Sequence, residues 1–158
     1  MLHRRYLFKQ PIMSAINFFT KEEKSQIKKA IADAELNTSG EIRLHVDNRC
    51  KGDVLDCAAS WFEKLSMHKT AKRNGVLFYL AVKDRKYAIL GDAGINAVTG
   101  DDFWDKIKEE MLTYFREDRF AEGLAKGISM AGDQLKKHFP YKSDDQNELS
   151  DEISFGKE

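Results

Sequence analysis

Residues 75–82 form a near-continuous apolar run, GVLFYLAV, which limits the folds open to this chain more than any other segment. A strand with apolar side chains on both faces is typical of the middle of a sheet that is covered on each side. The charged turn KDRK then leads into a second apolar run, KYAILGD. Because so short a connection favours a hairpin, we expect these two strands to pair antiparallel.

The residues before this hairpin predict a helix, a strand and another helix. Thr20 and Glu23 form a capping box ahead of a helical apolar pattern over 21–36. Apolar and polar residues alternate over 41–47, EIRLHVD, as in a strand with one wetter face. Apolar residues return to helical spacing over 53–67. Because a strand, a helix and a strand follow in that order, we expect a right-handed parallel crossover between the first two strands.

Two more helical patterns, over 101–115 and 120–139, follow the hairpin. The whole order predicts an α/β fold, a three-layer α/β/α sandwich with a small mixed sheet of three or four strands. We expect one domain over 18–140, an N-terminal extension over 1–17 and an acidic, flexible tail over 141–158. Within that tail, order is expected only around Ile153 and Phe155. Residues 1–12 are interpreted as an upstream extension before an alternative start at Met13.

The composition excludes several classes of partner. The 26 basic and 26 acidic side chains cancel, so no global field favours nucleic acid. No stretch approaches the roughly 20 apolar residues of a membrane helix, and we expect no membrane insertion. Cys50 and Cys57 are too few for a disulfide framework and are interpreted as ordinary helix residues, Cys57 as part of the core. A cytoplasmic, monomeric protein is the expectation.

The loop after the hairpin concentrates acidic side chains. Asp92 ends the second hairpin strand, and Asp101 and Asp102 open the next helix. Hairpin and crossover geometry should bring Glu41 and Asn74, with Arg73 just before Asn74, to the same edge of the sheet as Asp92. Carboxylate and amide oxygens suit calcium or magnesium. The loop therefore predicts a divalent-cation site made of Asp92, Asp101, Asp102, Glu41 and Asn74.

Other interpretations of the polar residues stay open. The loop is also explained without a ligand if Asp101 is a helix N-cap, Asp102 a first-turn acid and Asp92 a turn former. The opposite edge gathers a second polar set, Asp47, Asn48, Asp84 and Arg85, which is also typical of a solvated hairpin turn. No phosphate loop, serine elbow or zinc motif is present. His45 is interpreted as a surface or semi-buried histidine.

The chain resembles the TPM domain family over about residues 18–140. The resemblance rests on TSGEIRLHV for the first strand, RNGVLFYLAVKDRKYAILGD for the hairpin, GINAVTGDDFWDKI for the following loop and helix, and FAEGLAKGI near the end. It implies an α/β/α sandwich, divalent-cation binding in some members, and acid phosphatase activity in one. It also implies a role in the maintenance of membrane protein complexes.

The resemblance implies ligands at Glu41, Asn74 and Asp101 or Asp102. The sequence departs from the family pattern at GDAGIN, where GYGLE is common. Asn96 there replaces an acid and Asp92 adds one, so the ligand list of the family does not transfer unchanged.

Two functions follow from these observations. The first is a calcium- or magnesium-binding domain that acts as a metal-dependent phosphatase on a phosphomonoester, with Glu41 as ligand or base. The second is a non-catalytic adaptor in protein-complex maintenance that binds a protein partner through the acidic tail or through Phe103 and Trp104. Exposed aromatic side chains would favour the adaptor.

Overall fold

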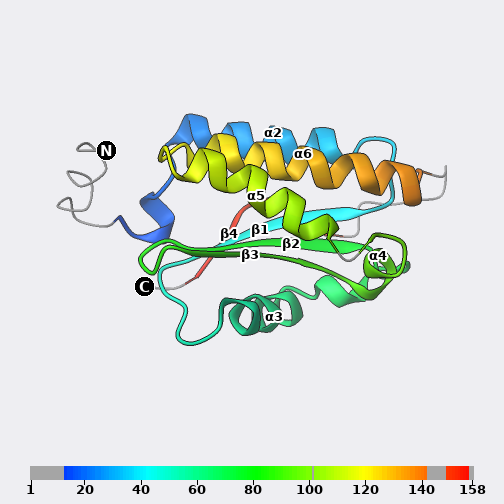
Figure 1. The fold of residues 1–158 in the computed structure, drawn as a ribbon, viewed down its shortest axis with the longest axis horizontal. Helices are drawn as coiled ribbons and strands as arrows, with labels where there is room; N and C mark the ends of the chain where they lie inside the picture. The colour runs from blue at the N-terminus through cyan, green and yellow to red at the C-terminus, as the bar shows by residue number, and fades with distance from the viewer. Residues whose placement is uncertain (1–12, 101, 142–148, 157–158) are drawn as a thin grey trace.

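The computed structural model describes residues 13–100, 102–141 and 149–156. A four-stranded sheet lies between two helical layers, with α2, α5 and α6 on one face and α3 on the other (Figure 1). The expected three-layer α/β class is confirmed. The helices are α2 (Lys21–Glu35), α3 (Val54–Lys64), α4 (Ala93–Asn96), α5 (Phe103–Phe115) and α6 (Phe120–His138), with 3-10 turns η1 (Ala15–Asn17) and η2 (Met67–Lys69). The strands are β1 (Glu41–Asp47), β2 (Gly75–Ala81), β3 (Lys86–Gly91) and β4 (Ser154–Phe155).

The strands lie in the order β3-β2-β1-β4. β1 runs parallel to β2, with Glu41 opposite Gly75. β2 and β3 form the expected antiparallel hairpin, with Val76 opposite Gly91. This register places the first residues of β1 and β2 and the last residue of β3 at one edge. All seven residues of β2 are buried, as a central strand requires.

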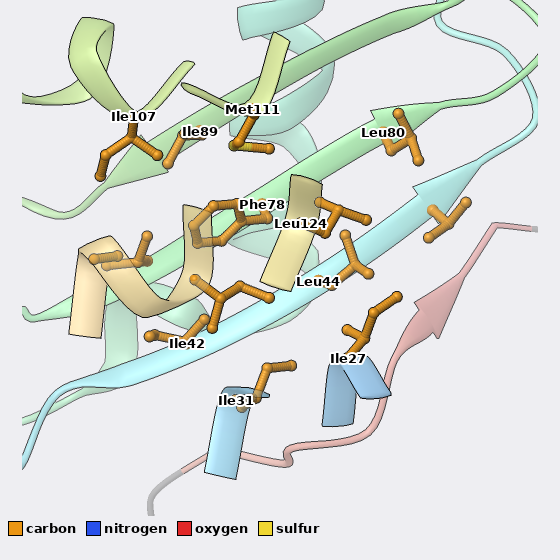
Figure 2. Packing of buried hydrophobic residues seen from close by; sticks show 14 of the residues in the cluster. Ile27, Ile31, Ile42, Leu44, Phe78, Leu80, Ile89, Ile107, Met111 and Leu124 are labelled. Atoms are coloured by element: carbon orange, nitrogen blue, oxygen red, sulfur yellow. The ribbon is translucent and has the colours of Figure 1, made fainter. Parts of the chain in front are cut away.

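The main core lies between the sheet and the layer of α2, α5 and α6. Ile31 of α2, Leu44 of β1, Phe78 of β2 and Leu124 of α6 meet there (Figure 2). Each of the first three is fully buried, and full burial of such a side chain contributes about 1.5–3 kcal/mol. The capping box predicted at the start of α2 is present, since Thr20 Oγ1 accepts a hydrogen bond from Glu23 N. This layer fixes the sheet against which the site is built.

Both ends of the predicted domain need correction. Ala15 is fully buried and its amide donates to Asn48 Oδ1 at 2.7 Å, so packing begins before residue 18. At the other end, Ser154 and Phe155 pair with β1 as a parallel strand. The order expected around Ile153 and Phe155 is therefore present. Residues 142–148 and 157–158 of the expected tail, and 1–12 of the expected extension, lie outside the described residues.

The interpretation of the two cysteines as ordinary helix residues needs correction, because only Cys57 lies in a helix, α3, and the two form a disulfide. Cys50 lies in the loop before α3 and forms a disulfide with Cys57, their Cα atoms 6.1 Å apart. The loop folds back because Lys86 Nζ donates to the carbonyl oxygens of Cys50 and Gly52, at 3.0 and 2.8 Å. Spacing alone does not reveal such a return of the chain.

None of the helices in the described parts of the chain is long and apolar enough to cross a membrane.

Candidate functional site

The predicted site lies at the edge where β1 and β2 begin and β3 ends. The amide of Glu41 donates to Asn74 O at 3.3 Å, and that of Asp92 donates to Gly75 O at 3.0 Å. The loop after β3 passes so close that a Cβ at Gly94 would lie 2.2 Å from Lys72 O. The structure therefore makes neighbours of the backbones of Glu41, Asn74 and Asp92.

Asp92 carries a buried carboxylate at this edge, with its side chain only 6% exposed. Arg73 binds it with two hydrogen bonds, Nε to Oδ2 and Nη2 to Oδ1, both 2.8 Å. Oδ1 also accepts from Ala93 N at 2.7 Å and so caps α4. Burial by itself would raise the pKa of Asp92, but the hydrogen bonds from Arg73 and Ala93 N outweigh it and lower that pKa. Asp92 is therefore ionised and already bound to a cationic side chain.

Asn74 and Glu41 are also buried, but their side chains have separate surroundings. Asn74 Nδ2 donates to Ser39 Oγ at 3.2 Å, whereas its Oδ1 has no hydrogen-bond partner among the described residues. Glu41 Oε1 accepts from Leu149 N at 3.1 Å, in the segment that leads to β4. Asn74 thus presents a buried oxygen without a donor, while Glu41 holds the C-terminal segment.

The two acids that open α5 behave differently from the buried ones. Asp102 occupies the N-cap position of α5 but makes no side-chain capping bond. Its side chain is 72% exposed and lies 3.6 Å from Lys106 Nζ. Asp101 lies outside the described residues. In the part of the chain that the structure describes, no group of three or more His, Cys, Asp or Glu residues is arranged to hold a metal ion.

A different set of acids surrounds Glu41, and the sequence did not reveal it. Glu35, at the end of α2, accepts a hydrogen bond from Ile42 N at 2.7 Å and also pairs with Asp151. Burial, followed by the hydrogen bond with Asp151 and the charges of Asp151 and Glu41, raises the pKa of Glu35 to about 9, although the hydrogen bond from Ile42 N opposes this change. Glu35 is therefore protonated at neutral pH. Asp151 comes from beyond the predicted domain, so no local pattern could have pointed to this pair.

At the opposite edge of the sheet, the second polar set mostly holds the chain's own loops. Asp84 accepts from Cys50 N and from Arg49 Nη1, both at 2.8 Å. Asn48 Oδ1 holds the amide of Ala15. These contacts favour a structural role for that turn.

His45 is fully buried, so its interpretation as a surface or semi-buried residue was wrong. Trp61 of α3 stacks on its ring with centroids 3.7 Å apart. Its Nδ1 lies 2.9 Å from Ser154 Oγ and its Nε2 lies 2.9 Å from Asp47 Oδ1. Ser154, on the neighbouring strand β4, lies 109 residues later in the chain, which is why strand alternation alone missed the burial.

Asp47 and Tyr79 complete this polar network under α3. Tyr79 OH donates to Asp47 Oδ2 at 2.6 Å. Burial opposes ionisation of Asp47, but the hydrogen bonds from His45 and Tyr79 outweigh it and lower the pKa of Asp47. Burial, followed by the bond to Asp47, raises the pKa of Tyr79. The network therefore contains an ionised carboxylate and a neutral phenol.

Comparison with known proteins agrees with the fold. The NMR structure of the BA42 protein from the psychrophilic bacterium Bizionia argentinensis is 47% identical, with a TM-score of 0.83 over 89% of this chain and 97% of that one. The N-terminal domain of cg2496 from Corynebacterium glutamicum is 15% identical, with a TM-score of 0.59 over 74% of each chain. An N-terminal domain from P. gingivalis is also 15% identical, with a TM-score of 0.66 over 80% of this chain and 83% of that one. At that identity the last two show a shared fold alone.

No curated protein matches the chain. The sequence model of the TPM domain matches residues 12–134, which is more than half of the chain. The chain therefore belongs to the TPM domain family.

Proposed function

We propose that this domain binds a calcium or magnesium ion at the edge where β1 and β2 begin. Asp92 and Asn74 form the fixed part of the site, and the loop acids Asp101 and Asp102 add further oxygen ligands. Glu41 borders the site as an additional ligand or as a base. All five residues offer the hard oxygen atoms that these ions prefer.

The observation that carries the proposal is the bare amide oxygen of Asn74. Asn74 is only 1% exposed, and its Oδ1 has no hydrogen-bond partner among the described residues. A buried polar atom without a partner costs about 1–3 kcal/mol. A bound cation would remove that cost by taking the oxygen as a ligand.

Arg73 occupies the position beside Asp92 that a cation would take. The guanidinium neutralises the buried carboxylate through two hydrogen bonds, yet the Arg73 side chain is 53% exposed. It is therefore free to move into solvent when a divalent ion binds. In this proposal Arg73 competes with the metal, and its removal strengthens metal binding.

A bound ion would also provide a simple route to phosphate-ester chemistry. It would polarise a phosphoryl oxygen and orient a water molecule on a phosphomonoester. Phosphatase activity comes to this proposal from the family resemblance, and it depends on the cation site.

Isothermal titration calorimetry with calcium and with magnesium tests the binding proposal. We expect saturable heat for the wild-type protein, tighter binding for Arg73→Gln and loss of binding for Asp92→Asn. Glu109→Gln, an exposed change on α5, is the matched control and should bind as the wild type does. The absence of heat at millimolar metal in every variant would refute the site. Binding without hydrolysis of p-nitrophenyl phosphate would remove only the phosphatase.

The adaptor alternative is less well supported by the surroundings of Trp104. This side chain is half-buried, packs so closely on Gly91 that a Cβ there would lie 2.4 Å from Cζ2, and donates Nε1–H to Asn96 Oδ1 at 3.0 Å. An aromatic side chain with these contacts is not free to enter a partner. Val98, which is 45% exposed and lines the same small pocket as Trp104, is the observation that favours a docking role there.

A further inference from the structure

A second site lies under α3, where the chain of hydrogen bonds links a hydroxyl, an imidazole and a carboxylate. Asp47 is ionised and can only accept hydrogen bonds, so His45 Nε2–H donates to it. In the neutral imidazole this leaves Nδ1 as an acceptor for the Ser154 hydroxyl. The order nucleophile, base and orienting acid is the arrangement that activates a serine.

We propose that Ser154, His45 and Asp47 form a nucleophilic relay that accepts an acyl group from a small neutral ester. Ser154 is the nucleophile and His45 the general base. Asp47 is a positioning residue that fixes the tautomer of His45.

The packing around the relay holds the imidazole in one orientation. Trp61 covers one face of the ring at 3.7 Å, and Tyr79 OH holds the second oxygen of Asp47. Both Ser154–His45 and His45–Asp47 distances are 2.9 Å, within the range for proton transfer between a nucleophile and its base. A ring with this support does not need to rotate before it accepts a proton.

Substrate access comes from the outer edge of the sheet. Ser154 lies on β4, the last strand in the order, and is half-buried, whereas His45 is fully buried. Gly156 lets the chain pass close to Asp47, since a Cβ there would overlap Asp47 Oδ1. The residue that carries the nucleophile is thus partly exposed while the base is buried, which suits a relay that must exclude water from the imidazole.

The charge of the network favours a neutral substrate. Asp47 is ionised. The hydrogen bond from Cys50 N lowers the pKa of Asp84 although burial opposes this change. The charge of Asp84 also acts on Tyr79, which is part of the network. Two carboxylates near the relay repel a phosphate dianion more than a neutral ester.

The reaction balances with the ester and water alone. Ser154 Oγ bonds to the carbonyl carbon while its proton moves to His45 Nδ1. The ester C–O bond then breaks and the alcohol leaves with that proton. Water attacks the acyl-serine, gives its proton to Nδ1, and the carboxylic acid departs as Oγ recovers a proton.

A fluorophosphonate probe tests the relay in excess EDTA, so that metal binding at the other site has no influence. Ser154 Oγ would bond to phosphorus with loss of fluoride. Ser150, exposed and four residues earlier, is an internal control, because trypsin cleavage at Lys142 and Lys157 leaves both serines in one peptide. We expect mass spectrometry to find Ser154 labelled at least about tenfold more than Ser150. Equal labelling of the two serines would overturn the proposal.

Variants separate the roles of the relay residues. Ser154→Ala should abolish labelling, Ser150→Ala should leave it unchanged, and His45→Gln and Asp47→Asn should each lower the Ser154-to-Ser150 ratio about tenfold or more. An unchanged ratio in folded His45→Gln would also overturn the proposal. If that variant does not fold, the wild-type ratio still decides, since it requires no substitution.

Discussion

Replacement of Glu35 by glutamine should stabilise the protein at neutral pH. The folded protein raises the pKa of this carboxyl from its ordinary value of 4.5 to about 9, mainly by burial. A raised pKa means that the folded state binds the proton more tightly than the unfolded state. The associated stability is fully present below pH 4.5 and is lost as the pH rises toward 9.

The size of the effect follows from that interval. Between pH 4.5 and pH 7 the free energy of unfolding falls by about 1.36 kcal/mol for each pH unit, because the folded state keeps a proton on Glu35 that the unfolded state releases. The loss of stability at pH 7 is therefore about 3 kcal/mol. Glutamine has no proton to retain. Its amide oxygen can accept from Ile42 N as Glu35 Oε2 does at 2.7 Å, and its NH₂ can donate to Asp151.

Urea unfolding at pH 4 and at pH 7.5 measures this difference. Glu35→Gln and the wild type should have similar free energies of unfolding at pH 4, and the variant should be more stable by about 3 kcal/mol near neutrality. Glu109→Gln, an exposed substitution on α5, should track the wild type at both values. A variant that is less stable than the wild type at pH 7.5 would show that Glu35 is ionised in the fold and would refute the reasoning.

Two further changes probe the core and the disulfide. Leu44→Ala, at a fully buried position, should lower the free energy of unfolding by about 2–5 kcal/mol, whereas Leu36→Ala, at a 59% exposed position, should change it by less than about 0.5 kcal/mol in the same urea assay. Reduction of the Cys50–Cys57 bond should lower the free energy of unfolding by about 2.5 kcal/mol, because the bond closes a short loop and so reduces the entropy of the unfolded chain. A reductant should have no effect on the variant in which both cysteines are replaced by alanine. Equal losses at the two leucines, or an unchanged midpoint on reduction, would contradict these two expectations.

The sequence predicted the elements whose signals are local. The apolar run of β2, the charged turn and β3 gave the hairpin, because its register depends on loop length and burial. The capping box at Thr20 marked the start of α2, since its two hydrogen bonds join residues three apart.

The features that were missed depend on contacts between distant residues. Ser154 and Phe155 form a strand too short to have its own pattern, and this strand, together with Trp61 of α3, encloses His45. The sequence also did not reveal which side chains the acidic residues of the predicted site bind. Hairpin and crossover geometry places Arg73 near Asp92, but it does not reveal the two hydrogen bonds that Arg73, in a left-handed turn with φ 50° before β2, donates to Asp92.

The cation site is tested most directly by a calcium titration followed through the backbone amide signals of ¹⁵N-labelled protein. We predict saturable shifts at Asn74 and Asp92 and in the loop up to Asp102, with signals around β4 unchanged. Shifts that are absent, or that appear only at surface acids such as Glu109, would contradict a cation site at the start of β1 and β2.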